Sequence, residues 1–165
     1  MSGTIFALSS VLSLQTTAAP VCAKGHEQLA LNTSVLRAEL MVAALSCGIQ
    51  PQYNAFVTKF EGALTEHGYL LRAFFQRQYG HSAEQRLNRF VTRLANDESR
   101  RSAEVGRAPY CKASSQLLQQ LMSDGPHGFR KVLNNPTLSV RHGISACEVT
   151  SRVDRRLHEE SAALE

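Results

Sequence analysis

The chain has 165 residues, of which 43% are hydrophobic and 7% are aromatic. These values exclude an intrinsically disordered chain and predict one globular domain large enough to bury its own core. The formal net charge is +4, which indicates a mildly basic surface. It argues against the dense positive charge of a dedicated nucleic-acid-binding domain.

The first residues have the composition of a secretory signal peptide. A run rich in apolar residues, Ile5–Leu14, precedes small residues at Thr16 and Ala18 that suit signal-peptidase cleavage. Pro20 disfavours a cut one residue later, so we predict cleavage after Ala18. No Lys or Arg stands before the apolar run, which departs from the usual pattern, and the alternative is a cytosolic protein with an apolar N-terminal segment. We expect a leader over residues 1–18 and a single helical domain over residues 19–165.

The four cysteines favour export as well. They are widely spaced and form no C-x-x-C motif: Cys22, Cys47, Cys111 and Cys147. An even number in this pattern predicts two disulfides formed in an oxidising compartment. The alternative is a set of four buried thiols, since free cysteine packs as a small hydrophobic residue. With the leader, this pattern predicts a periplasmic or secreted protein.

The stretch Leu29–Cys47 is the most apolar part of the predicted domain. Its apolar residues cover most of a helix circumference, and only Arg37 and Glu39 are charged. Such a helix cannot keep one face in water, and it is too short and too interrupted by polar residues to span a bilayer. We predict a central core helix that ends at Gly48, because glycine adopts the left-handed conformation that closes helices.

A second helical region follows Pro51, which suits the first turn of a helix. Apolar residues recur at three- and four-residue steps from Tyr53 to Tyr79, as expected for an amphipathic helix. Gly62 and Gly68 weaken the pattern, so the sequence leaves open one kinked helix or two.

Ser82-Ala-Glu-Gln85 has the spacing of a capping box and predicts a helix over residues 83–105. A fourth helix is expected over 112–123, then a turn over 124–128 and a short helix ended by Asn135-Pro136. Residues 137–144 are ambiguous. The apolar spacing after Ala146 predicts a last helix to about Glu160. The expected fold is therefore all-α, a compact bundle of about five helices around the central apolar helix.

Helix length restricts the disulfide pairing. A helix between Cys22 and Cys47 would place them roughly 30 Å apart, whereas a disulfide needs Cα atoms within about 7 Å. If consecutive helices run up and down, Cys47 meets Cys111 and Cys22 is left with Cys147. A sharp break at Gly62 or Gly68 would reverse this pairing.

The sequence contains few signs of catalytic chemistry. The six histidines are dispersed, and there is no H-E-x-x-H, G-x-S-x-G or phosphate-loop motif, so we predict no metal site and no cofactor. Glu39 is the one candidate general acid, because burial in an apolar helix would raise its pKa. Glu61 or Glu66 could then complete a hydrolase pair. The alternative is that Glu39 forms a structural ion pair with an arginine of the 83–105 helix.

An arginine stripe on the 83–105 helix is a candidate binding face for phosphate, acidic polysaccharide or an acidic protein. Its members are Arg86, Arg89, Arg93 and Arg100. Asp97 and Glu104 lie close to this stripe and dilute its charge, so an ordinary solvated helix face is the alternative.

Three segments carry a resemblance to known proteins: residues 31–48, Tyr53-Asn-Ala-Phe56 and residues 87–96. They resemble small exported four-cysteine helical proteins of bacteria that have no assigned activity. The resemblance covers the Cys22–Cys111 portion. It implies a periplasmic or secreted setting and supplies no catalytic residue.

These features predict a non-enzymatic exported protein that binds or scaffolds a partner in the bacterial envelope, either a protein or another envelope component. One rival hypothesis is a small hydrolase of an envelope polymer that uses Glu39 and a second carboxylate. The other is a weakly basic module that binds polyanions.

Overall fold

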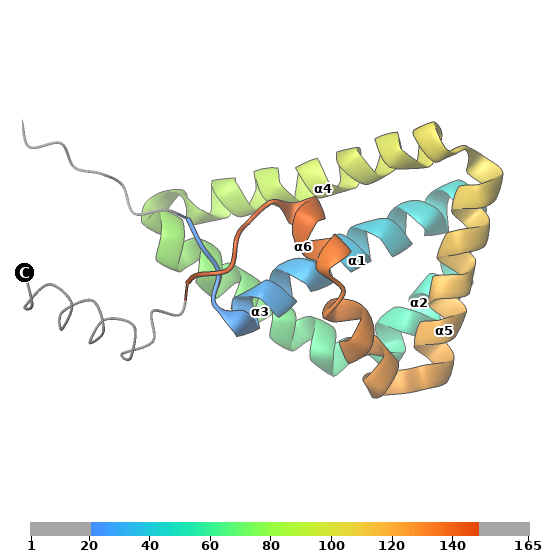
Figure 1. The fold of residues 1–165 in the computed structure, drawn as a ribbon, viewed down its shortest axis with the longest axis horizontal. Coiled ribbons are helices and arrows are strands. Elements are labelled where there is room, and N and C mark those ends of the chain that lie inside the picture. Colours follow the sequence, from blue (N-terminus) through green and yellow to red (C-terminus); the bar gives the residue numbers. More distant parts are fainter. Residues whose placement is uncertain (1–20, 149–165) are drawn as a thin grey trace, which may run out of the picture.

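The computed structural model describes residues 21–148, which form an all-α bundle (Figure 1). The helices are α1 (Gly25–Cys47), α2 (Gln50–Lys59), α3 (Glu61–Tyr79), the short 3-10 helix η1 (Gly80–Ser82), α4 (Ala83–Val105), α5 (Arg107–Leu133) and α6 (Pro136–His142). The predicted fold class is confirmed. The predicted leader lies outside the described residues.

Helix α1 is the centre of the bundle, as its apolar composition predicts. It packs against all five other α-helices. Figure 1 shows α4 along one side of α1, α3 and α2 along the other, and α5 crossing one end. Gly48 closes α1 in the left-handed conformation, and its N–H donates to the carbonyl oxygen of Ala44. Within residues 21–148, α1 is the one helix long and apolar enough to cross a membrane, and its neighbours bury most of that stretch.

The second helical region is two helices, and neither glycine separates them. The break falls at Phe60, while Gly62 and Gly68 lie inside α3. Phe60 is buried and stacks on Phe129 of α5, with ring centroids 4.8 Å apart. The break between α2 and α3 therefore coincides with the packing of the Phe60 ring in the core. It does not coincide with either glycine.

Helix α4 has the predicted bounds but not the predicted cap. Ser82 makes no side-chain cap, and its hydroxyl donates to the carbonyl oxygen of Tyr79 at 3.0 Å. The chain enters α4 directly from η1, with the Ala83 N–H bonded to the Gly80 carbonyl. The predicted capping box is therefore wrong: the preceding 3-10 turn already orients the first residues of α4.

Helix α5 is longer than predicted and is kinked where a turn was expected. It begins at Arg107 and continues to Leu133, with a non-helical residue at Gly125 (φ 60°, ψ −143°) just before Pro126. The positive φ suits glycine, and proline cannot continue the hydrogen-bond ladder. The predicted turn and the short helix after it are thus the kink and last part of α5.

After α6 the chain is extended, and Ala146 pairs with Ala23 in an isolated parallel bridge. The first residues of the predicted last helix are therefore not helical, and the rest of it lies outside the described residues. Disulfides join Cys22 to Cys147 and Cys47 to Cys111, with Cα separations of 4.8 and 5.5 Å. These are the pairs expected from helices that run up and down.

Candidate functional site

Glu39, the candidate general acid, belongs to a cluster of two carboxylates and two guanidinium groups. Arg101 of α4 lies 3.1 Å from one Glu39 oxygen, and Arg141 of α6 lies 2.6 Å from the other. Both arginines also pair with Glu98, Arg101 at 2.7 Å. The ion pair with an arginine of residues 83–105, the alternative to a catalytic role, is thus present in the structure.

The charges within this cluster balance, and its members come from three helices. The Glu98 side chain is only 1% exposed. The two arginines therefore stabilise its negative charge in place of water. Hydrogen bonding to Glu98 raises the pKa of Arg101 above its usual value. The cluster ties α1, α4 and α6 together.

Tyr110 extends the cluster to α5. Its hydroxyl donates to the Glu39 backbone carbonyl at 3.2 Å, and the Arg101 guanidinium lies 5.4 Å from the centre of its ring. Burial raises the pKa of this phenol.

The proposed second carboxylates of a hydrolase do not join Glu39. Glu61 and Glu66 are exposed on α3, and in residues 21–148 neither shares a hydrogen-bond partner with Glu39. The carboxylate that accompanies Glu39 is Glu98. Glu98 lies three residues before Arg101 on the same helix, a spacing at which two side chains can pair.

The arginine stripe of α4 is divided among different neighbours. Arg93 donates to the His142 carbonyl at 3.1 Å and lies 3.6 Å from Asp97. Arg100 pairs with Asp97 at 3.1 Å and with Glu104 at 3.7 Å. Arg86 covers the Tyr79 ring, while Arg89 contacts the backbone of its own helix. Acidic neighbours thus lower the positive charge over half of the stripe.

Among residues 21–148 the histidines lie far apart along the chain, and one of them is buried. His142 is buried at the end of α6, and its Nε2 has no hydrogen-bond partner among the described residues. Burial, together with the nearby Arg93 charge, lowers the pKa of His142 to about 4. No group of three or more His, Cys, Asp or Glu residues within 21–148 is placed to hold a metal ion.

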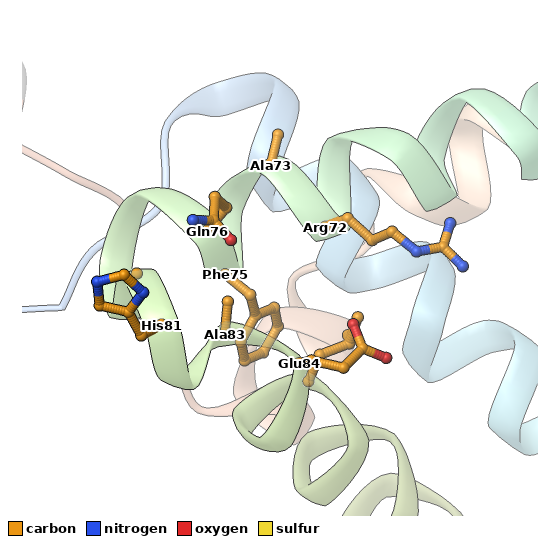
Figure 2. Close-up of a pocket in the computed structure, with 9 residues that line it drawn as sticks. Arg72, Ala73, Phe75, Gln76, His81, Ala83 and Glu84 are labelled. Carbon is orange, nitrogen blue, oxygen red and sulfur yellow. The ribbon is translucent and has the colours of Figure 1, made fainter.

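A concave surface lies between α3 and α4, which diverge from η1 (Figure 1). It begins at the η1 corner with a pocket of about 500 Å³. Figure 2 shows Phe75 and Ala83 in the middle of this pocket, with His81 at one end and Arg72 and Glu84 at the other.

Two further pockets continue this surface. The next has a volume of about 460 Å³ and shares Arg72, Glu84 and Leu87 with the first. A third, of about 130 Å³, shares Arg37, Leu71 and Val91 with the second and reaches Met41 and Tyr53. Because neighbouring pockets share walls, the three form one continuous surface, which we call the α3–α4 groove.

Helix α1 forms the floor of the α3–α4 groove. Arg37 and Met41, four residues apart, lie on one side of α1 and line the groove. At 100° per residue, Asn32 and Glu39 lie on the roughly opposite side, where they contact α6. The core helix is therefore covered by α6 on one side and open on the other.

The groove combines exposed apolar side chains with charges of both signs. Tyr69 is 67% exposed and Val91 is 45% exposed. The charged residues in its walls are Arg37, Glu61, Arg72 and Glu84. Val91 has the spacing of a core residue of α4, four residues after Leu87 and three before Leu94, which are both buried. Its exposure could not be predicted from this spacing, because α3 leaves that edge of α4 uncovered.

Comparisons with family models, with curated proteins and with solved structures found no match to this chain.

Proposed function

We propose that this chain is an exported binding protein that holds an amphipathic helix of a partner protein in the α3–α4 groove. The observation that carries the proposal is the continuous groove with α1 as its floor. Two helices that diverge over a third leave the kind of channel in which helix-in-groove complexes form. Exposed contiguous apolar surface of this kind is typical of interaction sites.

The lining defines the chemistry of the partner. Met41, Leu71 and Val91 offer apolar contacts for side chains spaced three or four residues apart on one helix face. Arg37 and Arg72 suit acidic residues at the margin of that helix, while Glu61 and Glu84 suit basic ones. A partner helix with an apolar stripe and mixed charges beside it fits this surface.

Export is the second part of the proposal. The two disulfides in the described residues are typical of proteins that fold in oxidising compartments. The leader expected over residues 1–18 agrees with this setting. We propose the bacterial periplasm or the extracellular space as the location.

The two rival functions have weaker geometric support. Both Glu39 oxygens accept hydrogen bonds from guanidinium groups, which suits a structural ion pair better than a general acid. The arginine stripe shares its charge with Asp97 and Glu104, which weakens its attraction for a polyanion.

Photo-crosslinking from defined positions tests the proposal. A photoreactive amino acid at Tyr69 or Val91 should give one adduct with a partner protein in the native compartment. Val140 is the matched control, because it is 80% exposed on α6 and outside the groove. The partner segment cross-linked through the groove should be helical, with apolar residues at three- and four-residue spacing.

Loss of binding on substitution completes the test. Val91→Lys should weaken partner binding more than tenfold, and Val140→Lys should leave it unchanged. Equal cross-linking from Val140, or full binding by Val91→Lys, would contradict the proposal. If the protein hydrolyses cell-wall fragments and Glu39→Gln abolishes this activity, the hydrolase hypothesis would replace the proposal. If the protein binds polyanions with an affinity that falls steeply with salt concentration, the polyanion-binding hypothesis would replace it.

A further inference from the structure

A separate pocket of about 360 Å³ lies between α2 and α5, away from the α3–α4 groove. Three apolar side chains from these helices form part of its wall, along with Ile49 just before α2. Its lining residues are Ile49, Gln52, Ala55, Ser115, Leu118, Gln119 and Met122. This set includes none of the residues that line the groove.

The pocket exists because α2 and α5 are fixed at both ends and have small side chains between. At one end the Cys47–Cys111 disulfide joins the end of α1, just before α2, to the start of α5. At the other end Lys59 donates to the Met122 carbonyl at 2.5 Å, and Phe60 of the α2–α3 junction stacks on Phe129. Between these ends, Ala55 and Ser115 are too small to fill the space.

The lining of this pocket carries no charge. Each of the three pockets that form the α3–α4 groove has at least one charged side chain in its wall. A charged ligand entering the α2–α5 pocket would lose hydration without gaining an ion pair. Gln52, Ser115 and Gln119 supply neutral donors and acceptors.

We propose that the α2–α5 pocket binds a small uncharged molecule with an apolar body and one hydrogen-bonding head, such as an alcohol or a primary amide. The volume lies near the lower end of the range of small-molecule sites, about 300–1,000 Å³, so the ligand is small. Leu118 and Met122 contact the apolar body, and the thioether of Met122 adapts to its shape. The glutamine amides and the Ser115 hydroxyl bind the head.

The two methionines of the described residues allow a direct test. Met122 lines this pocket and Met41 lines the groove, so a ¹³C-methyl methionine NMR spectrum of the full disulfide-bonded chain reports on both sites. In a titration with straight-chain primary alcohols, the Met122 methyl signal should shift and saturate while the Met41 signal stays in place. Affinity should rise about fourfold for each added methylene until the pocket is full.

A carboxylate of the same chain length should bind at least tenfold more weakly at pH 7. Ala55→Phe fills the pocket from an exposed position and should abolish the Met122 shift. Asn54→Phe is the matched control, because it adds the same ring one residue away, outside the lining, and should leave the shift intact. Ser115→Leu replaces Ala55→Phe if that variant does not fold.

Four results would overturn the proposal: no saturable shift at Met122, an equal shift at Met41, equal affinity for the carboxylate, or a retained shift when the pocket is filled. Binding at Met122 alone, lost on filling and selective for the neutral ligand, would support it. The partner-binding role of the groove is unaffected by either outcome.

Discussion

The two sides of α1 differ in how completely the rest of the chain covers them. On the α6 side, polar residues of α1 lie in the core with partners: Asn32 donates to the Leu133 carbonyl at 2.8 Å, and Glu39 pairs with Arg101 and Arg141. On the groove side, Arg37 and Met41 line an open surface, and Leu45 is 69% exposed. Helix α1 thus buries polar groups that have partners on one side and leaves apolar groups in water on the other.

This contrast separates the residues of α1 that stabilise the fold from those that would contact the proposed partner. Buried polar groups that all have partners hold neighbouring elements in a defined arrangement. Exposed apolar side chains add little to the fold, because water still reaches them. Substitutions on the α6 side should therefore act on the free energy of unfolding, and substitutions on the groove side on binding.

The largest effect is expected from Glu98→Ala. Removing this buried carboxylate leaves Arg101 and Arg141 with a single partner, Glu39. Breaking a buried ion pair by removing one side costs about 3–5 kcal/mol. Urea denaturation should show this loss. Glu104→Ala, whose carboxylate is exposed and pairs with Arg100 at the surface, should change the free energy of unfolding by less than about 1 kcal/mol. Equal effects would remove the distinction between the cluster and the surface pairs.

The disulfide on the closed side should have the next largest effect. Cys22–Cys147 spans 125 residues and anchors the extended chain after α6 beside Ala23. The double variant Cys22→Ser, Cys147→Ser should lose about 2–4 kcal/mol of stability, measured by denaturation without reductant. Binding in the groove should remain, because neither cysteine lines it. Loss of groove binding in the folded variant would show that the two sides are coupled.

His142 gives the closed side a pH dependence. Its pKa is lowered to about 4 in the folded protein, whereas the unfolded chain has a histidine pKa of about 6.5. The unfolded state therefore binds more protons between these values, so stability is fully present above about pH 6.5 and falls as the pH decreases toward 4. The expected loss is on the order of 2–3 kcal/mol.

Denaturation curves at several pH values measure this loss, and His142→Gln is the control because it cannot titrate. The variant should show a flatter stability profile between pH 6.5 and about 4.5, above the range in which ordinary carboxylates dominate. A profile that matches the native chain would assign the pH dependence to other groups.

The elements that depend on local sequence could be predicted, and those that depend on packing could not. The apolar run of α1 predicted a central core helix, and Gly48 predicted where that helix ends. Helix length excluded a Cys22–Cys47 pair, and an assumed up-and-down order of the helices gave the two pairs that the structure contains. The break at Phe60 and the burial of His142 depend on contacts with residues far along the chain, so no local pattern contains them.

The difference between local sequence and long-range packing also explains which parts of the candidate sites could be predicted. Glu39 could be recognised as an unusual carboxylate on an apolar helix, and its pairing with an arginine of α4 was one of two interpretations. Arg141 could not be predicted as its second partner, because residues 137–144 had no clear pattern. The groove could not be predicted from the sequence, because Val91 has the same spacing as the core residues of α4. Val91 is exposed because α3 diverges from α4.

The smallest change in stability is expected on the groove side, and it tests whether that side is open in solution. Val91→Lys should alter the free energy of unfolding by no more than about 0.5 kcal/mol, since substitutions at exposed sites have small effects and lysine favours helices. Leu94→Ala, on the same helix but buried, should cost about 2–5 kcal/mol. A cost for Val91→Lys close to that of Leu94→Ala would mean that α3 closes over this edge of α4 in solution. The groove would then be part of the core, and the proposed binding surface would not exist.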